Sequence, residues 1–303
     1  MFTITAAVEN TVAMPLRPGI IPGLLGEHGL ALLIESSSGL WLYDTGRGKA
    51  LLPNLKTLGV SPDSVDGVIL SHGHLDHFGS LKQLLEARTR PLEVYGHPDC
   101  FARRYTRIGG KGGAAGGEGL PRSQGQAPAA EELRPAGMPW SPEELERLGA
   151  RLHLSREPVW LGPDLLITGE IPRRFGFERV GEGFLVERQS GLMKDELLDD
   201  QALVLLGREG FLALTGCAHA GICNILERGA ELCGQPVFGA AGGLHLLNAP
   251  KERLLGTLAY FREKRPRLLA CCHCTGFPET LELACAFPGV FRSLNAGECI
   301  EFA

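Results

Sequence analysis

The chain has 303 residues, 44% of them hydrophobic, with a mean hydropathy of +0.03 and a net charge of −5 at neutral pH. This composition supplies apolar material for a large core and no basic field to attract nucleic acid, which counts against a DNA- or tRNA-processing nuclease. No apolar run reaches the roughly 18 residues needed to span a bilayer, and the first residues alternate like a strand rather than a signal peptide.

Nine cysteines, an odd number, indicate reduced thiols in a cytosol rather than a disulfide framework. We therefore expect a cytoplasmic protein, with no membrane or nucleic-acid partner. The sequence leaves its oligomeric state open.

Short strands interleaved with helices follow one another along the chain, which is typical of an α/β protein. The apolar patterns predict a first strand at the N-terminus, a hairpin over 30–35 and 40–43, a buried strand over 67–70 and a helix over 77–87. Further strands are predicted at 92–95, 151–154, 158–161, 164–168, 183–188 and 267–272, a second hairpin over 200–206 and 211–215, and helices over 220–233 and 250–264.

Residues 105–140 interrupt this pattern. They carry few apolar side chains, and seven of the eleven residues 109–119 are glycine. We expect neither helix nor strand there, and interpret the stretch as a flexible insertion in a single domain that covers residues 1–303. The next helix has a clear start, because Ser141, Pro142 and Glu144 form a capping-box sequence.

Residues 71–79 contain four metal-binding side chains within six positions: His72, His74, Asp76 and His77. Imidazole nitrogens and carboxylate oxygens are ligands suited to Zn²⁺ or a similar divalent ion. They follow the buried strand 67–70, in a turn that can direct the first two histidines to one side and the other two residues to another. The alternative, a surface turn that is merely rich in histidine, requires four donors to gather by chance. The pattern therefore predicts a metal site with room for two ions.

Other candidate ligands also follow predicted strands. His219 comes after strand 211–215, and His273 after strand 267–272. Glu170 and His245 are candidates for either metal ligands or substrate contacts. Residues adjacent at a strand end point to opposite faces, so the cysteines around His273 cannot all bind one ion. We therefore expect His273 to be the ligand and these cysteines to be packing residues. His28, His97 and His153 are weaker candidates.

Five motifs together identify a family resemblance. They are Asp44-Thr-Gly46, the His-x-His-x-Asp-His run from His72 to His77, Thr215-Gly-Cys-Ala-His-Ala-Gly221, Gly242-Gly-Leu-His245 and His273-Cys-Thr-Gly276. Their combination resembles the metallo-β-lactamase superfamily, and within it the subfamily of dihydropterin-(ribofuranosyl)aminobenzene-phosphate synthase-like proteins. The resemblance implies a four-layered αββα sandwich with the metal site at one edge, where strands from both halves end.

The resemblance also exposes a departure from the superfamily pattern. Many members carry a bridging aspartate in a Gly-Asp pair at the end of a hairpin strand, whereas this chain has Gly216-Cys217. Either Cys217 or His219 takes the place of that aspartate, or the second metal is bound more weakly.

These features predict a metal-dependent hydrolase of a small, phosphorylated metabolite that uses a metal-activated hydroxide. Two zinc ions are expected, with Mn²⁺ or iron as alternatives, and Asp76 would orient the hydroxide or take its proton. Arg104 and Arg173 would contact a phosphate if they converge on the pocket, and are otherwise solvated surface arginines.

Three other functions stay open. The first is a dihydropterin-type synthase, in which metals assist the departure of pyrophosphate. The second is a non-hydrolytic protein that stores metal or senses redox state through Cys217 and the cysteines at 271–274. The third is an ester or thioester hydrolase of the glyoxalase or lactonase kind; a true β-lactamase is not expected without a secretory signal.

Overall fold

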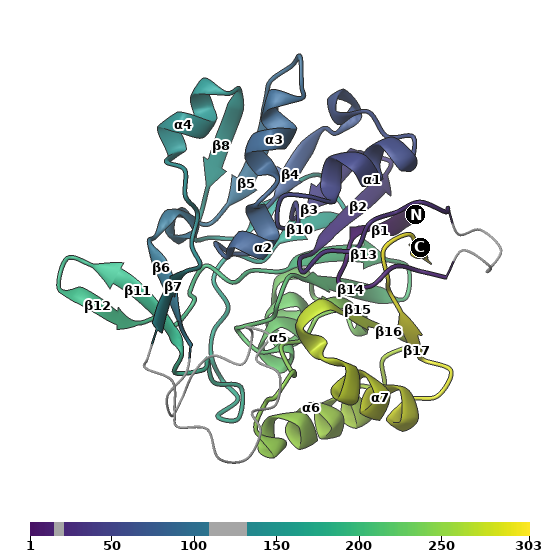
Figure 1. The fold of residues 1–303 in the computed structure, drawn as a ribbon. Coiled ribbons are helices and arrows are strands. Elements are labelled where there is room, and N and C mark those ends of the chain that lie inside the picture. The colour runs from purple at the N-terminus through teal and green to yellow at the C-terminus, as the bar shows by residue number, and fades with distance from the viewer. Residues whose placement is uncertain (15–20, 109–131) are drawn as a thin grey trace.

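The computed structural model describes residues 1–14, 21–108 and 132–303, and two seven-stranded sheets dominate it (Figure 1). The first sheet has the strand order β18-β1-β2-β3-β4-β5-β8, and the second has the order β17-β16-β15-β14-β13-β10-β9. The strands of the first sheet are β1 (Phe2–Val8), β2 (Ala31–Ser36), β3 (Gly39–Tyr43), β4 (Gly67–Ile69), β5 (Leu92–Gly96), β8 (Ala150–Leu154) and β18 (Cys299–Phe302). Those of the second are β9 (Val159–Trp160), β10 (Leu165–Ile167), β13 (Leu203–Gly207), β14 (Gly210–Thr215), β15 (Val237–Gly243), β16 (Leu268–Cys272) and β17 (Phe291–Ser293).

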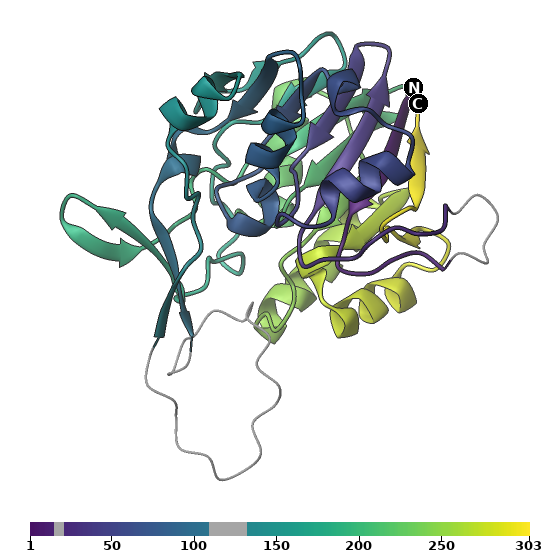
Figure 2. The same ribbon diagram turned by 45° about the horizontal axis from the view of Figure 1, so that its top comes forward.

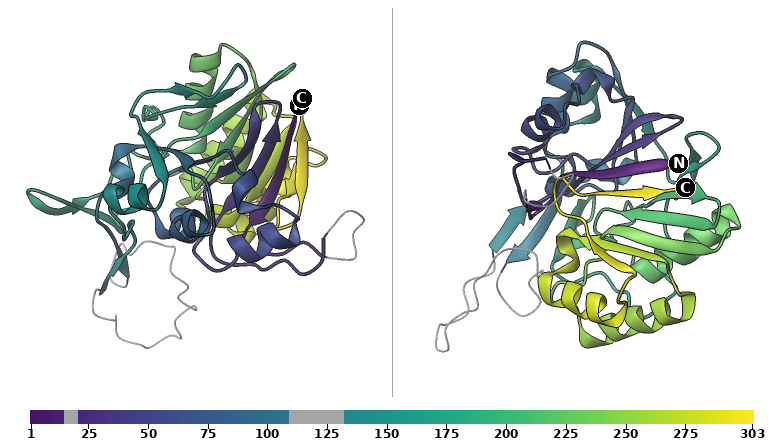
Figure 3. Two further views of the ribbon diagram at one scale, coloured as in Figure 1. Left: turned by 90° about the horizontal axis from the view of Figure 1, so that it is seen from above. Right: turned by 90° about the vertical axis from the view of Figure 1, so that its right-hand side faces the viewer.

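Helices cover the outer face of each sheet (Figure 3). The first sheet carries α1 (Leu51–Thr57), α2 (Leu75–Phe78), α3 (Leu81–Glu86) and α4 (Pro142–Arg147), and the second carries α5 (Ile222–Cys233), α6 (Lys251–Lys264) and α7 (Phe277–Ala286). The result is the predicted αββα order of layers. No helix among the described residues is both long and apolar enough to cross a membrane.

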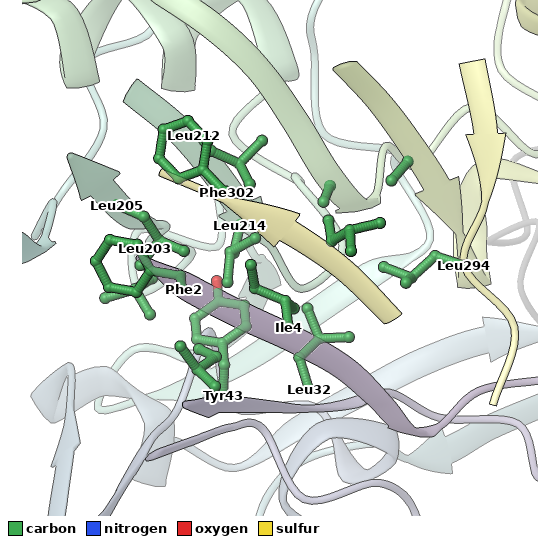
Figure 4. Packing of buried hydrophobic residues seen from close by; sticks show 14 of the residues in the cluster. Phe2, Ile4, Leu32, Tyr43, Leu203, Leu205, Leu212, Leu214, Leu294 and Phe302 are labelled. Atoms are coloured by element: carbon green, nitrogen blue, oxygen red, sulfur yellow. The ribbon is translucent and has the colours of Figure 1, made fainter. Parts of the chain in front are cut away.

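Three hydrophobic cores follow from these four layers. The central core lies between the sheets, where Phe2, Ile4 and Leu32 of the first sheet meet Leu212 and Leu214 of the second (Figure 4). Alternate residues of β1 point into it, because successive side chains of a strand face opposite sides. The two outer cores lie between each sheet and its helices.

The direction of the strands determines where loops gather. Strands β3, β4, β5 and β8 pair in parallel in the first sheet, and β14 to β17 pair in parallel in the second. Parallel strands that share a sheet end at the same edge. The loops that carry the candidate ligands therefore emerge together from the carboxyl ends of these strands.

Most elements predicted from the sequence are confirmed within two or three residues. Both hairpins, the strands over 67–70, 92–95 and 267–272, and the helices over 220–233 and 250–264 are present. The capping box of Ser141 and Glu144 is formed, with each side chain accepting a backbone N–H of the other. The helix predicted over 77–87 is instead two short helices, α2 and α3, which are separated by Gly79 and Ser80. Only glycine fits at position 79, because a Cβ there would collide with the Arg47 carbonyl.

The expectation of no regular structure over 105–140 is wrong at both ends of that range. β6 (Arg104–Ile108) and β7 (Glu132–Pro135) pair antiparallel, and they join β11 (Phe184–Arg188) and β12 (Gly191–Lys194) in a four-stranded sheet. The glycine run 109–119 lies outside the described residues. Figure 2 shows the β11–β12 hairpin projecting from the body of the molecule. The β6–β7 pair was missed because its short, polar strands lack an apolar alternation.

Arg104, at the start of β6, is a buried support rather than a surface cation. Its Nε donates to Asp195 Oδ2 at 2.6 Å, and its Nη2 donates to Asp199 Oδ1 at 2.7 Å. The other oxygen of Asp199 accepts the backbone N–H of Gly73 at 2.7 Å, between His72 and His74. Gly73 has no room for a side chain, because a Cβ there would collide with the Arg104 guanidinium and the Cys100 carbonyl.

Replacing Arg104 by alanine should destabilise the protein by about 3–5 kcal/mol, because two buried carboxylates would lose their cation. Urea unfolding of the purified full chain measures this difference. The matched control is Arg103→Ala, because the Arg103 side chain is 78% exposed and its removal should change stability by less than about 0.5 kcal/mol. An Arg104→Ala protein of undiminished stability would contradict the supporting role.

Candidate metal centre

The candidate ligands converge where five strands end. Asp44 follows β3, the loop with His72 and His74 follows β4, and Cys217 follows β14. His245 follows β15, and His273 follows β16. Because these strands belong to both sheets, the site spans the edge between the two halves of the sandwich.

The first ligand group consists of His72, His74 and His219. One ligand atom from each lies within 4.8 Å of the others, and all three side chains are buried. His72 Nε2 approaches His74 Nδ1 at 3.0 Å. Three convergent imidazoles are the ligand set of many catalytic zinc sites, which leave a fourth position for water or substrate.

The second ligand group gathers around the carboxylate of Asp76. Its Oδ2 lies 3.5 Å from His273 Nε2, 3.8 Å from His77 Nε2 and 3.2 Å from His28 Nε2. His28 was a weak candidate from sequence, because only a single histidine in a loop marked it. The two groups are contiguous, since His72 also lies within 4.8 Å of ligand atoms of His77 and Cys217.

Asp44 holds one histidine of each group. Its Oδ2 accepts hydrogen bonds from His77 Nδ1 and from Ser71 Oγ, both at 2.7 Å, and its Oδ1 accepts the Ser71 backbone N–H. Ser71 Oγ in turn lies 2.9 Å from His72 Nδ1. With Nδ1 of both rings occupied in this way, Nε2 is the nitrogen that each can offer to a cation. A superfamily motif marked Asp44 in the sequence, but its contacts required the structure.

The loop backbones are held in an uncommon conformation at this edge. Asp44, Ala218, His245 and His273 all have left-handed backbones, with φ between 48° and 63°. They make up four of the seven such non-glycine residues in the described part of the chain. Strained backbones of this kind collect at functional sites, where the surrounding structure imposes them.

Burial and neighbouring charges set the protonation of these groups. Burial, with the nearby rings, lowers the pKa of His72 and His219 well below its usual value, and lowers that of His74 to about 3. These three rings are therefore neutral, with a lone pair available.

Charged neighbours act differently on the second group. Burial would lower the pKa of His77, but the adjacent Asp44 and Asp76 raise it to about 9. Burial would raise the pKa of Asp76, but His77, His273 and His28 hold it well below its ordinary value. The Asp76 carboxylate is therefore ionised, and a metal ion would displace the proton of His77.

One observation that is independent of the sequence motif also indicates that these ligands fit a metal ion. The Nε2 atoms of His219 and His273 are buried and have no hydrogen-bond partner. An unsatisfied polar atom inside a protein is costly unless a ligand completes it. Both atoms belong to the ligand groups, so a bound cation would satisfy them.

A cavity of about 400 Å³ opens onto both groups. Its lining includes His74, Asp76, His219 and His273 from the ligand groups, together with His245. Side chains not identified from the sequence complete it: Asn10, Arg47, Arg134, Phe184 and Asn248. The Phe184 ring stacks on His74, with ring centroids 5.3 Å apart. Because β7 and β11 bring Arg134 and Phe184 here, only the tertiary fold could have revealed them.

Four sequence candidates lie outside the ligand groups. His245 lines the cavity and packs against His219, with ring centroids 4.3 Å apart. Glu170 is instead bound by His97 Nε2 at 3.1 Å and Arg156 Nη1 at 2.5 Å, away from the cavity. Arg104 is buried against two aspartates.

Arg173 lines a separate cavity of about 280 Å³ and donates to the Glu196 and Leu197 carbonyls. The structure therefore does not bring Arg104, Arg173 or Glu170 to the cavity that adjoins the ligand groups. Of the other weak candidates, His153 pairs with Glu93.

Replacing Asp44 by asparagine should weaken metal binding about 10- to 100-fold, because the amide nitrogen cannot accept the bonds that orient His77 and His72. Competition with a chromophoric chelator measures this affinity. Asp66→Asn is the control, because Asp66 is an exposed carboxylate that accepts only the Leu40 N–H in a surface hairpin. Equal affinities in the two variants would contradict the role given to Asp44.

Comparisons with known proteins agree with this architecture. A metal-dependent hydrolase of the β-lactamase superfamily, Tm1679, is structurally similar over the whole of both chains, with a TM-score of 0.78 and 26% identity. Zinc-bound PqqB from Methylobacterium extorquens shares the fold, with a TM-score of 0.52 and 10% identity over 99% of this chain and all of its own.

Sequence relatives lead to the same conclusion. The 7,8-dihydropterin-6-methyl-4-(beta-D-ribofuranosyl)-aminobenzene-5'-phosphate synthase of Methanocaldococcus jannaschii is 28% identical over 91% of this chain and 90% of its own. The model of the family described as the metallo-beta-lactamase superfamily matches residues 25–231. With this match over more than half its length, and with the αββα sandwich and the ligand groups at its edge, the chain belongs to the metallo-β-lactamase superfamily.

Proposed function

We propose that the protein is a metal-dependent hydrolase of a small, phosphorylated metabolite, with two zinc ions in its site. The observation that carries the proposal is the contact of two contiguous ligand groups with one cavity of about 400 Å³, which members of both groups line. His72, His74 and His219 would hold one ion; Asp76, His77 and His273 would hold the other. Bound zinc supplies Lewis acidity, which polarises a phosphoryl oxygen and lowers the pKa of water to about 7.

Asp76 would be the proton acceptor in this reaction. Its carboxylate lines the cavity, and its Oδ2 lies 3.2 Å from His28 Nε2. The His28 side chain is 43% exposed, so a proton taken up at Asp76 can pass through this imidazole to solvent. The Phe184 ring packs against His74 and His219, with ring centroids 5.3 Å and 5.1 Å apart, and so covers one side of the first ligand group.

Two arginines in the cavity favour a phosphorylated substrate. Arg47 and Arg134 line the same cavity as the ligand groups, and guanidinium groups bind phosphate through paired hydrogen bonds. They take the phosphate-binding role that the sequence suggested for Arg104 and Arg173, since neither of those two arginines lines this cavity.

A synthase is the second candidate, and the archaeal relative supports it. That relative is named as a synthase of a dihydropterin-ribofuranosyl-aminobenzene phosphate and aligns with nearly the whole chain. In such a reaction the same site would stabilise a departing pyrophosphate while an arylamine attacks. The cavity offers an aromatic face at Phe184 for a planar ring and two arginines for phosphate groups.

Metal-depleted protein should not hydrolyse bis(p-nitrophenyl) phosphate, and added Zn²⁺ or Mn²⁺ should restore turnover. His74→Ala should lower turnover by at least about 100-fold, because it removes a ligand rather than one of the outer groups whose loss costs 10- to 100-fold. Release of p-nitrophenolate measures the rate. Metal-loaded protein without turnover, but with pyrophosphate release from a dihydropterin pyrophosphate only when an arylamine is present, would favour the synthase.

Arg47→Ala should raise KM for a phosphorylated substrate about 10-fold or more, since a hydrogen bond to a charged group contributes about 1.5–3 kcal/mol. The metal content should stay unchanged, because Arg47 is not in either ligand group. The matched control is Arg174→Ala, an exposed arginine that lines the separate cavity and pairs with Glu231. Equal effects of the two substitutions would remove the basis for phosphate recognition by Arg47.

A further inference from the structure

Two thiols lie within the proposed metal centre. Cys217 is 4% exposed, and its Sγ lies 3.2 Å from His77 Nε2. It forms one group with His72 and His77 and another with His273 and Cys274, with ligand atoms within 4.8 Å in each. Cys217 therefore connects the imidazoles on the side of the first ion with those on the side of the second.

Among the described residues, the two groups that contain Cys217 hold histidines and Cys274 but no carboxylate. Asp76 is the only carboxylate in the ligand groups found among the described residues, and it lies on the His28 and His273 side. Asp44 is occupied by Ser71 and His77. His273 belongs to one group with both sulfurs, and its buried Nε2, 3.5 Å from Asp76 Oδ2, makes no hydrogen bond, so its lone pair is available to a cation.

The remaining cysteines provide a contrast. Cys271 packs in the core beneath the helices of the second sheet, and Cys272 packs between the sheets. Neither belongs to any ligand group among the described residues. Their burial needs no explanation beyond hydrophobic packing, whereas Cys217 and Cys274 line the cavity among imidazoles.

We propose that sulfur would help hold the second ion, with the Cys217 and Cys274 thiolates acting as ligands beside His273. The proposal rests on the metal centre of the proposed function and specifies the chemistry of its second site. A thiolate is a softer ligand than the carboxylate whose place Cys217 takes. The site should therefore prefer Zn²⁺, Co²⁺ or Cd²⁺ to Mn²⁺ or Mg²⁺.

Zinc-edge X-ray absorption of the unaltered full chain tests this directly. With two zinc ions bound, a sulfur shell is expected at about 2.3 Å, in addition to nitrogen and oxygen at about 2.0–2.2 Å. Co²⁺-loaded protein should show a near-ultraviolet sulfur-to-cobalt charge-transfer band. This band should weaken in Cys217→Ala and in Cys274→Ala, and should be lost when both cysteines are replaced.

Two controls keep the test independent of folding and activity. Cys271→Ala removes a buried thiol outside the ligand groups, so its band should equal that of the unaltered protein. Cys217→Asp should keep two ions, since a carboxylate also binds metals, while its sulfur signal weakens as in Cys217→Ala. Its affinity for Mn²⁺ should rise relative to that for Zn²⁺.

Two bound zinc ions with no sulfur shell would overturn the proposal while leaving the hydrolase intact. A charge-transfer band that persists undiminished in the double variant would do the same. Failure of the unaltered chain to bind metal at all would instead overturn the proposed function together with this inference.

Discussion

The buried carboxylate of Asp44 is the constraint on which the site depends. It is fully enclosed, and it receives hydrogen bonds from the Ser71 backbone, the Ser71 hydroxyl and His77. Through these contacts a single side chain fixes the start of the ligand loop and the orientation of rings in both ligand groups. Gly216 permits this arrangement, because a Cβ there would collide with Ser71 Oγ. The loop after β14 can therefore approach closely enough to bring Cys217 and His219 to the same place.

Hydrogen bonds outside the cavity also hold the ligand loop and the ends of the neighbouring strands in position. Arg104 links the β6 strand to Asp195 and Asp199, and Asp199 holds the Gly73 N–H within the ligand loop. The Tyr43 hydroxyl donates to the Gln201 carbonyl, and Gln201 donates to the Leu70 and Ser71 carbonyls. The segment before β13 is thus fastened to the ends of β3 and β4. These bonds join the two sheets at the edge where the ligands meet, and they explain why buried polar residues concentrate there.

The features that could be predicted from the sequence are those that depend on a local pattern of residues. The ligand cluster from His72 to His77 is marked by its density of donors, and the αββα order of layers by family motifs that follow strands. The sequence could not reveal groups brought together by distant contacts. Arg104 and Arg173 resembled phosphate ligands because their charge is visible in the sequence, whereas the burial of Arg104 and the separate cavity of Arg173 are not. Arg134 and Phe184 carried no local signal, because they approach the cavity only through the pairing of β6, β7 and β11. Arg47 directly follows the Asp44-Thr-Gly46 motif, but a lone arginine after a motif carries no signal of its own. Glu170 follows a strand as expected, yet His97 and Arg156 occupy its carboxylate.

The distribution of the ligands over the chain has a consequence for its turnover in the cell. His72 to His77 extend from the first sheet, whereas His219 and His273 extend from the second. A cation bound by both sets acts as a reversible cross-link between distant parts of the chain, and its binding free energy adds to that of folding. Scarcity of the metal would then loosen the seam between the sheets and expose the chain to proteases. The abundance of the protein would in this way follow the supply of its metal.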